Sequence, residues 1–260
     1  MASSQLHALR LILFFLVLGL MSLAESARPA RLWPVSRRKR WIFHFGVSLF
    51  NTLLTRLLTS APLLFLINYM ETKKWGLSHA LGLDGLAEVV ATIVLFDMLD
   101  YGWHRLNHRI PFFWRFHKAH HTDTEVDVTT SLRFHPGELL LSCGAKALWI
   151  LFWGPSLTAF ILFEAAITAY SQFHHSNIDF PEAIEKKLRW LHMTPRLHAS
   201  HHTVTLRSRD ANFSTIFLIW DKLFGTFQEA DYEEMKQLGL TEGRGTYLSA
   251  KEFLLTPVGA

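Results

Sequence analysis

Long apolar runs alternate with mixed polar and aromatic stretches along the chain. The run at 45–68 is long enough to cross a bilayer as a helix, which takes roughly 20 residues. Arg56 lies near its middle and must face protein or reach the interface, and Pro62 should kink the helix. The pattern predicts membrane helices, and the apolar runs are residues 11–24, 45–68, 85–101 and 139–173.

The last run, 139–173, is long enough for two passes, and Gly154-Pro155 interrupts it near the middle. Proline lacks a backbone N–H and ends a helix, so the run predicts a helical hairpin in the membrane. The first run, 11–24, is too short to span as a straight helix. It fits either a signal peptide that is cut after Ala24 or as late as Ala27, or a retained helix.

A cationic block without acidic residues lies between the first two runs, from Arg28 to Arg40. Such blocks mark the cytoplasmic flank of membrane helices. If this block is cytoplasmic, the later runs cross out, back, out and back, and both histidine-rich stretches face the cytoplasm. The block's ordinary role is topological, although it would also attract anionic headgroups or an acidic electron donor.

Composition narrows the chemistry. Half of the 260 residues are hydrophobic and only 18% are charged, which excludes a disordered or fibrous chain. The single cysteine, Cys143, excludes an internal disulfide framework, a cysteine-rich zinc site and a cysteine-ligated iron–sulfur cluster. Any metal site must therefore use histidine or carboxylate ligands.

The chain has 15 histidines, and eight of them fall into three clusters with helical spacing. Positions i, i+3 and i+4 share one helix face, so imidazoles at this spacing can converge on a metal. A single cluster would equally fit a solvated basic face. The clusters are His104 and His108, then His117, His120 and His121, then His198, His201 and His202.

Eight imidazoles exceed what one zinc ion takes, so the clusters suggest two metal ions. Nitrogen ligands suit iron, zinc, copper and nickel alike, and ligand type does not choose among them. The zinc-protease motif H-E-x-x-H is absent, which disfavours hydrolysis.

Further motifs surround the histidines, and together they resemble the membrane fatty acid hydroxylase and sterol desaturase superfamily of non-haem di-iron oxygenases. The resemblance spans about residues 41–228. The motifs are DMLDYGWHR at 97–105, FWRFH at 113–117, RFHPGE at 133–138, HSNI at 175–178, TPR at 194–196, NF at 212–213 and WDKLFGT at 220–226.

The resemblance implies two iron ions on the cytoplasmic side that activate O2 as cosubstrate to hydroxylate or desaturate a lipid C–H bond. The eight clustered histidines carry over as catalytic metal ligands. His175 is a further expected ligand, and His135 is a tentative one that would equally orient a loop before Pro136. His174 and His192 have no clear counterpart, and we expect them to be exposed or hydrogen-bonded elsewhere.

Several other residues are candidates for supporting the ligands. Asp97 or Asp100 would accept a ring N–H from His104, or would pair with Arg105 at the helix end. Asn177 and Glu138 are similar candidates. Asp221 is expected to form a packed turn, with no catalytic role. The hairpin aromatics are more often packing than cavity lining, and they are Trp149, Phe152, Trp153, Phe160 and Phe163.

The sequence thus predicts an all-α integral membrane bundle with a cytoplasmic, histidine-rich helical cap that holds two metals. We divide it into an apolar segment and basic flank at 1–40, a hydroxylase-like domain at 41–228 and a tail at 229–260. With no G-x-G-x-x-G or C-x-x-C-H motif, electrons should come from a separate protein. No nucleic acid partner is expected, and oligomeric state stays open.

The alternative from another class is a non-enzymatic membrane protein that binds or transports a divalent metal such as zinc. A polar route through the membrane would support it. The apolar runs contain few ionisable residues and no histidine relay, which weighs against it. Those ionisable residues include Arg56, Glu88, Asp97, Lys146 and Glu164.

Overall fold

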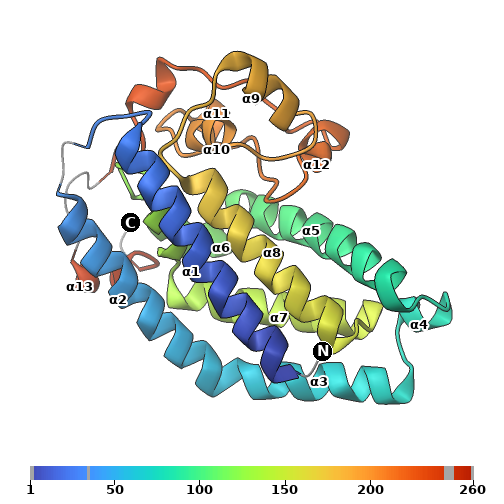
Figure 1. Ribbon diagram of the computed structural model, residues 1–260. Helices are drawn as coiled ribbons and strands as arrows, with labels where there is room; N and C mark the ends of the chain where they lie inside the picture. Colours follow the sequence, from blue (N-terminus) through green and yellow to red (C-terminus); the bar gives the residue numbers. More distant parts are fainter. Residues whose placement is uncertain (1–2, 34–35, 243–248, 259–260) are drawn as a thin grey trace.

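The computed structural model describes residues 3–33, 36–242 and 249–258. Within these ranges the fold is helical, with isolated β-bridges and no strand (Figure 1). The elements are α1 (Ser3–Ala27), α2 (Arg37–Thr55), the π-helix η1 (Arg56–Ser60), α3 (Ala61–Lys73), α4 (Leu77–Ala80), α5 (Gly85–Arg109), α6 (Pro111–His121), the 3-10 helix η2 (Val128–Leu132), α7 (Pro136–Trp153), α8 (Leu157–His175), α9 (Glu182–Leu188), α10 (Pro195–His201), α11 (Leu206–Arg209), α12 (Ile219–Leu223), the 3-10 helix η3 (Glu234–Lys236) and α13 (Ala250–Leu255).

The first helix is longer than its apolar run. It packs alongside α8 (Figure 1). Helix formation extends beyond residues 11–24 on both sides, and Ala8–Ala27 makes a 20-residue segment that is long and apolar enough to cross a membrane. The apolar run alone underestimated this helix because flanking small and polar residues also take up helical geometry.

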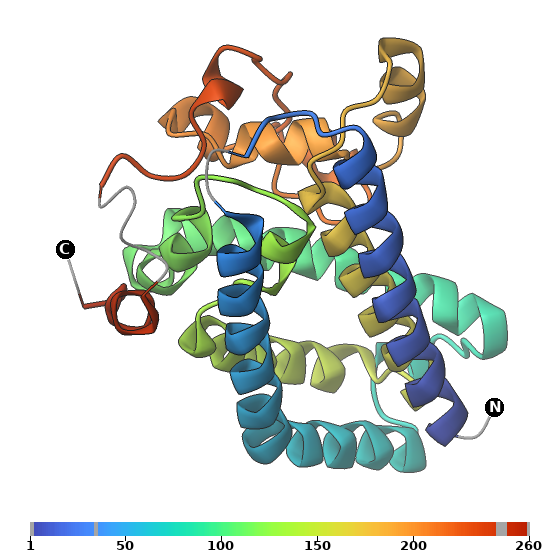
Figure 2. The same ribbon diagram turned by 60° about the vertical axis from the view of Figure 1, so that its left-hand side comes forward.

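The second apolar run is one bent rod rather than a straight helix. In Figure 2, α2 descends and α3 turns away along the base of the molecule. The bend lies at η1, and Pro62 stands in the first turn of α3. Proline cannot donate to the preceding turn, so the helix widens there, and this confirms the kink predicted at Pro62.

Helices α7 and α8 form the hairpin that Gly154-Pro155 predicted. Gly154 ends α7 with a φ of 69°, and the hydroxyl of Ser156 caps α8 by accepting from the N–H of Ala159. A Cβ on Gly154 would lie 2.1 Å from the carbonyl oxygen of Trp75. The turn therefore needs glycine both for its left-handed backbone and for the approach of the loop before α4.

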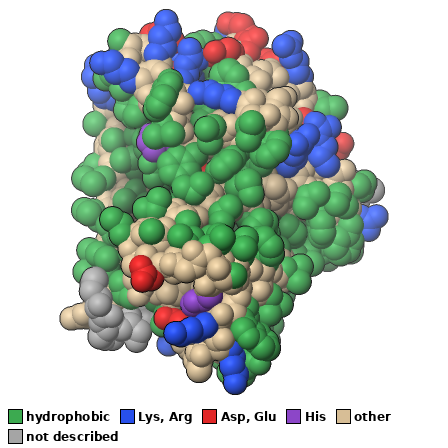
Figure 3. Space-filling model, turned by 90° about the vertical axis from the view of Figure 1, so that its right-hand side faces the viewer, with side chains coloured by type: hydrophobic (Ala, Val, Ile, Leu, Met, Phe, Trp, Pro, Cys, Tyr) green, Lys and Arg blue, Asp and Glu red, His purple; other side chains and the backbone are tan. Residues whose placement is uncertain are grey.

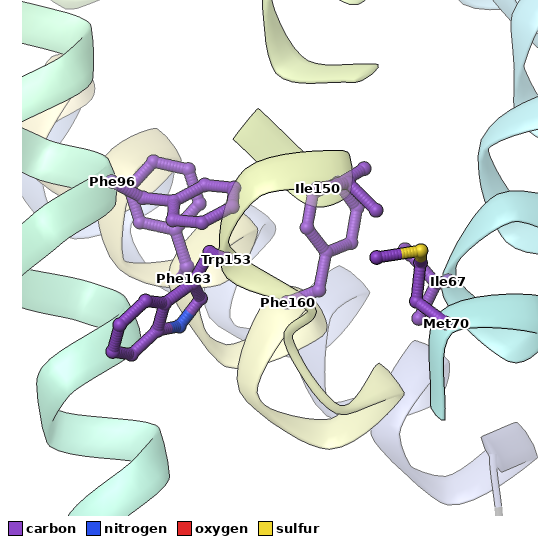
Figure 4. Close-up of a cluster of buried hydrophobic side chains, with 7 residues drawn as sticks. All are labelled: Ile67, Met70, Phe96, Ile150, Trp153, Phe160 and Phe163. Atoms are coloured by element: carbon purple, nitrogen blue, oxygen red, sulfur yellow. The ribbon is translucent and has the colours of Figure 1, made fainter. Parts of the chain in front are cut away.

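A buried aromatic and aliphatic cluster joins α3, α5, α7 and α8 (Figure 4). Trp153, Phe160 and Phe163 pack here against Phe96, and Trp149 borders them, whereas Phe152 is exposed. The packing alternative for the hairpin aromatics is thus the correct one. The cluster consists of Ile67, Met70, Phe96, Ile150, Trp153, Phe160 and Phe163.

The surface is apolar around its middle. Figure 3 shows hydrophobic side chains across the centre of one face, with most charged groups toward its two ends. Among the described residues, two segments are long and apolar enough to span a membrane, Ala8–Ala27 and Arg37–Ala80. In the described part of the chain, helices α5, α7 and α8 are not identified as long and apolar enough to span a membrane. A large exposed apolar surface is typical of a site that contacts a membrane or another protein. Exposed apolar side chains also lie on α1, α2 and α7, and they include Leu11, Ile12, Phe15, Leu49, Leu53, Leu148 and Leu151.

Short helices form a cap over one end of the long ones. Figures 1 and 2 show α9, α10, α11 and α12 together there, with the ends of α1 and α8 leading into them. The segment after α1 is tied to this end, because the N–H of Ala30 donates to the carbonyl of Asn177. The basic block at 28–40 and the cap therefore lie at the same end of the bundle.

Candidate metal centre

Three helices carry the clustered histidines to the base of the cap. Helix α5 continues past its apolar run to Arg109, so His104 and His108 project one turn apart from its end, as predicted. Helix α6 begins at Pro111, a favoured first helical position, and ends at His121. Helix α10 begins after Thr194, whose hydroxyl accepts from the N–H of Leu197, and it ends at His201.

Nine imidazoles gather into two groups, and the ligand nitrogens within each group lie within 4.8 Å of one another. His175, from the end of α8, joins the eight clustered histidines. The first histidine group consists of His104, His108, His117, His121 and His201, and the second histidine group consists of His120, His175, His198 and His202.

Each H-x2-H-H motif is shared between the two groups. His117 and His121, one turn apart, belong to the first group, while His120 belongs to the second. In the other motif the pattern is reversed, because His198 and His202 belong to the second group and His201 to the first. The two motifs thus cross, and the groups touch where the rings of His121 and His202 stack at 4.4 Å.

The outer ring nitrogens of most of these histidines have fixed partners. Nδ1 of His104 lies 2.8 Å from the carbonyl of Phe213, that of His201 lies 2.7 Å from the carbonyl of Ala211, and that of His120 lies 3.1 Å from the carbonyl of Arg133. A carbonyl can only accept, so Nδ1 carries the proton. The lone pair is then on Nε2, the nitrogen that faces the group.

Carboxylates stand behind two members of the first group. Nδ1 of His117 donates to Glu138 at 2.7 Å, and Nδ1 of His108 lies 3.4 Å from Asp210. In the second group, Nδ1 of His175 donates to the backbone carbonyl of Ser171 at 2.7 Å. The supporting role expected for Glu138 is confirmed, while Asp210 was not foreseen because no motif marks it.

The inner nitrogens of the grouped histidines contact one another. Nε2 of His175 lies 3.0 Å from Nε2 of His120 and 2.9 Å from Nε2 of His198. In the first group, Nε2 of His201 lies 3.1 Å from Nε2 of His104. Where the protons sit on Nδ1, these contacts bring lone pairs together, and a cation between them removes the repulsion. The donor set therefore fits two metal ions.

Burial lowers the pKa of most of these imidazoles, which favours the neutral form that binds metal ions. Burial, together with the neighbouring His117, lowers the pKa of His104 to about 3. Burial also lowers the pKa of His175 to about 4, against the opposing hydrogen bond to the carbonyl of Ser171. For His120, His198 and His202, burial and adjacent imidazoles hold the pKa well below its ordinary range.

The aspartates near His104 do not act as predicted. Asp97 accepts from the N–H groups of Ile216 and Phe217 and from the indole of Trp220. Asp100 accepts from the hydroxyl of Thr215. Neither fixes the tautomer of His104, because the carbonyl of Phe213 takes that position. Asp100 and Asp97 precede His104 by four and seven residues, so the spacing correctly placed them on the same side of α5. It could not show that their oxygens accept hydrogen bonds from a loop distant in sequence.

Asp221 forms the packed turn that its motif predicted. It is fully buried and accepts from the N–H groups of Phe213 and Ser214 and from the hydroxyl of Thr226, all at 2.6–2.8 Å. It thereby fixes the backbone whose Phe213 carbonyl accepts from His104.

The histidines outside both groups include His135, His174 and His192. Nδ1 of the tentative ligand His135 accepts from the N–H of Gly137 and caps α7, while its Nε2 lies 3.2 Å from the carbonyl of Leu254. Both nitrogens are thus occupied by backbone, as the loop-orienting alternative for His135 expected. His192 contacts the hydroxyl of Tyr170 at 3.1 Å, so it is hydrogen-bonded elsewhere.

His174 is not exposed. It is 3% exposed, its Nδ1 lies 3.3 Å from the carbonyl of Thr215, and its ring lies 4.0 Å from that of His198. It packs against the second histidine group without belonging to it. Asn177, a supporting candidate in the sequence, instead bonds to the backbone of Arg31 on both sides of its amide.

A buried ionic cluster supports α6 and η2 and was not predicted. Arg40 donates to Asp123 and Asp127 at 2.7 Å each, and Asp127 caps η2. Burial opposes ionisation of Asp123, but Arg40, His44 and Arg133 together outweigh it and lower the pKa of that carboxyl. The charge pattern placed Arg40 in a cationic cytoplasmic flank, and no sequence signal linked it to the two acids.

A cavity of about 260 Å³ adjoins the histidines and lies between α5, α7 and α8. Its wall includes ring atoms of both groups, among them His104 and His198, together with Trp103, Phe134 and Ile167. A larger cavity of about 560 Å³, beside Arg31 and Asn177, contains none of the histidines. The smaller cavity is the one from which a substrate would reach the imidazoles.

Comparison with known proteins identifies the family to which the chain belongs. Residues 89–226 match the fatty acid hydroxylase family model. The chain is 29% identical over 154 residues to the ornithine lipid hydroxylase OlsE of Rhizobium tropici, covering 59% of this chain and 46% of that protein. It is 30% identical over 151 residues to alkylglycerol monooxygenase of Homo sapiens, covering 58% of this chain and 32% of that protein.

It is also 29% identical over 192 residues to the very-long-chain aldehyde decarbonylase GL1-10 of Oryza sativa subsp. japonica, covering 68% of this chain and 62% of that protein. The alignments span about a third to three fifths of these relatives' lengths. No solved structure matches the chain significantly. The family match covers more than half of the sequence and contains all nine grouped histidines, so the chain belongs to the fatty acid hydroxylase family.

Proposed function

We propose that the protein is a membrane-bound, O2-dependent oxidoreductase that hydroxylates a C–H bond of a lipid at a histidine-held di-iron centre. The observation that carries this proposal is the convergence of nine imidazole nitrogens in two adjacent groups. Most of the outer nitrogens are fixed by acceptors, so the inner lone pairs are oriented before any metal arrives.

The proposed ligands are the first and second histidine groups as defined above, with one iron for each. His135 is not among them, because its two nitrogens serve the backbone. Two bound irons would supply the O2 activation that side-chain acids and bases cannot. The protein's own part is to hold the ions, to exclude water by burying the ligands, and to present a carbon in the adjoining cavity.

Hydroxylation is favoured because two of the aligned relatives are named as a hydroxylase and a monooxygenase. The third is a decarbonylase, and desaturation would begin from the same hydrogen abstraction. The substrate class, a lipid, follows from the family and from the position of the cavity beside the apolar helices.

We further propose that the cap faces the cytoplasm. The basic block at 28–40 and the histidine groups lie at one end of the bundle, and such blocks stay on the cytoplasmic side. Residues 41–228 then form the catalytic domain, with a membrane anchor before it and a tail after it. Electrons would come from a separate protein docking on the cap.

The metal-binding or transport alternative is less well supported. It would require the ions to enter and leave, whereas the second histidine group is buried throughout and the first is bordered by Trp114 and Phe213. The aligned relatives are also enzymes by name.

The test is oxygen-isotope labelling in cells that express the protein. Membrane lipids from cells grown under 18O2 should contain a hydroxylated species with one heavy oxygen, which mass spectrometry detects. A matched strain carrying His120→Ala should lack that species. Shortened or unsaturated lipids without heavy oxygen would instead indicate decarbonylation or desaturation, and an unchanged lipid profile would contradict the proposal.

A further inference from the structure

The cavity beside the histidines has a polar wall, although α7 and α8, which contribute to it, are mostly apolar in sequence. On α8, Glu164, Thr168 and Gln172 follow one another every fourth residue and therefore share one face. On α7, Ser142 and Lys146 have the same spacing. All five line the cavity, and a core helix face would normally be apolar at these positions.

An ion pair forms the far end of this wall. Nζ of Lys146 lies 2.5 Å from Glu164, and Arg10 of α1 approaches the same carboxylate at 3.5 Å. The side chains of Lys146 and Glu164 are 22% and 14% exposed, so both keep part of their surface open rather than sealed in the core. Ionisable groups within membrane helices are costly and mark functional sites.

A neutral amide lies nearer the histidines. Gln172 is fully buried, lines the cavity and precedes His175 by three residues. Neither its amide oxygen nor its amide nitrogen has a hydrogen-bond partner among the described residues. Leaving a buried amide without partners costs free energy, so the group calls for a ligand that offers both a donor and an acceptor.

The charges in the wall select among ligands. Three acidic side chains, Asp100, Glu138 and Glu164, line the cavity, together with the base Lys146. A ligand carboxylate would therefore meet carboxyl groups, and a plain hydrocarbon would leave the Gln172 amide without a partner. A hydroxyl or an amide both donates and accepts, and it satisfies this wall.

We propose that the cavity binds a lipid through a neutral hydrogen-bonding group, a hydroxyl or an amide, held by the Lys146–Glu164 pair and Gln172. The inference rests on the proposed function, because it takes the cavity to be where the reacting carbon lies. Glu164 and His175 are eleven residues apart on one helix, an axial distance of about 16 Å. The polar group of the substrate thus lies within about that distance of the carbon that reacts.

The alternative of a proton or water path along the same wall fits the observations less well. Leu139, Ile167 and Phe134 give the cavity an apolar part beside the polar one. The volume of about 260 Å³ approaches that of ligand pockets, whereas a file of single waters needs neither the volume nor the apolar part. An amphipathic cavity matches an amphipathic ligand.

The test is competition binding on the purified full-length protein in detergent, with tritiated 1-hexadecanol as the probe. We expect unlabelled 1-hexadecanol and hexadecanamide to displace it at concentrations at least about tenfold lower than hexadecane or palmitate. Tenfold corresponds to about 1.4 kcal/mol, near the lower limit for a hydrogen bond to a charged group. Absence of probe binding, or equal displacement by all four compounds, would overturn the inference.

Two variants test whether the polar wall causes the preference for the alcohol over the hydrocarbon. The double substitution Lys146→Met with Glu164→Met removes the pair without leaving an unpaired charge, and Gln172→Met removes the amide. Each should bring 1-hexadecanol and hexadecane to within about threefold of each other. Thr59→Val is the matched control, because Thr59 bonds to the carbonyl of Thr55 in the bent helix away from the cavity, and it should keep the preference.

Retention of the preference in both wall variants, with slower O2 consumption, would overturn the inference in favour of a proton path. Melting temperature and metal content of each variant confirm that it is folded. The binding readout does not depend on turnover. A protein that prefers the alcohol but hydroxylates no lipid would refute the proposed function alone, and a hydroxylase without the preference would refute this inference alone.

Discussion

The two histidine groups differ in what holds their ligands. In the first group, carboxylates lie behind two imidazoles, at Glu138 and Asp210, whereas in the second group the outer nitrogens of His120 and His175 meet backbone carbonyls. A carboxylate makes an imidazole a stronger ligand than a carbonyl does. The first group also has five imidazoles against four. If each group holds one metal ion, as we propose, the comparison predicts that the chain would bind the two ions with unequal affinity, although each H-x2-H-H motif contributes to both groups.

Removing one ligand from each group gives the largest expected effect. His201→Ala and His120→Ala each open one group, and both should lower turnover by more than about 100-fold, beyond the loss typical for a residue that only supports a ligand. Metal content should fall by about half in each, because binding depends on a complete ligand set.

His192→Ala is the control, since His192 bonds to Tyr170 outside both groups and should keep its metal. Elemental analysis and turnover assays check these outcomes. Full metal loading and activity in His120→Ala would remove the second group from the site.

Removing a supporting charge should affect the first group selectively. Glu138→Gln keeps an acceptor for Nδ1 of His117 but removes the negative charge, and metal affinity should fall about 10- to 100-fold. Ser171→Ala is the matched change in the second group, and it should alter affinity less than about twofold because His175 donates to the backbone carbonyl. Chelator competition measures the metal affinity of both variants. An equal loss of affinity in the two variants would contradict the difference proposed between the two groups.

Disturbing the Asp221 turn should cost stability and loosen the first group. Asp221→Ala leaves the buried N–H groups of Phe213 and Ser214 unpaired, at about 1–3 kcal/mol for each. The carbonyl of Phe213 is the acceptor for His104, so the first group should lose metal before the second. Thermal unfolding combined with metal analysis follows both effects, and an unchanged melting temperature would contradict the role given to Asp221.

The metal-free protein should lose stability gradually in acid. The pKa values of His104 and His175 lie at about 3 and about 4 in the folded protein, against 6.5 for an ordinary histidine. The unfolded chain therefore binds more protons below about pH 6.5, and stability falls as the pH drops from there toward these folded values.

Above about pH 7 both states are neutral at these residues, and their contribution should be constant. Thermal unfolding of chelator-treated protein between about pH 5 and pH 8 gives the readout. Greater stability at the acidic end of this range than at neutral pH would show that the imidazoles are charged in the folded state.

The apolar runs and the i, i+4 spacings were sufficient to predict much of this structure. The hairpin at Gly154-Pro155, the kink at Pro62 and the continuation of α5 to His108 depend on local chemistry that a single segment contains. The convergence of the clusters was inferred from their number and from the family resemblance. The structure brings those histidines together, and their role as ligands stays a prediction.

What the sequence did not show depends on contacts between distant segments. Asp97 faces α12 rather than His104, Asp210 stands behind His108, and His174 is buried against His198. Each of these follows from which loop packs on which helix, and no local spacing contains that information. The same holds for the division of each motif between two groups.

The central claim is that the two groups hold two irons. Elemental analysis together with Mössbauer spectroscopy of detergent-purified protein, expressed with iron-57, tests it most directly. We expect about two irons per chain in a coupled centre, because two adjacent ligand groups place two metal ions close together. Zinc without iron after iron-replete expression, or a single isolated iron, would contradict it.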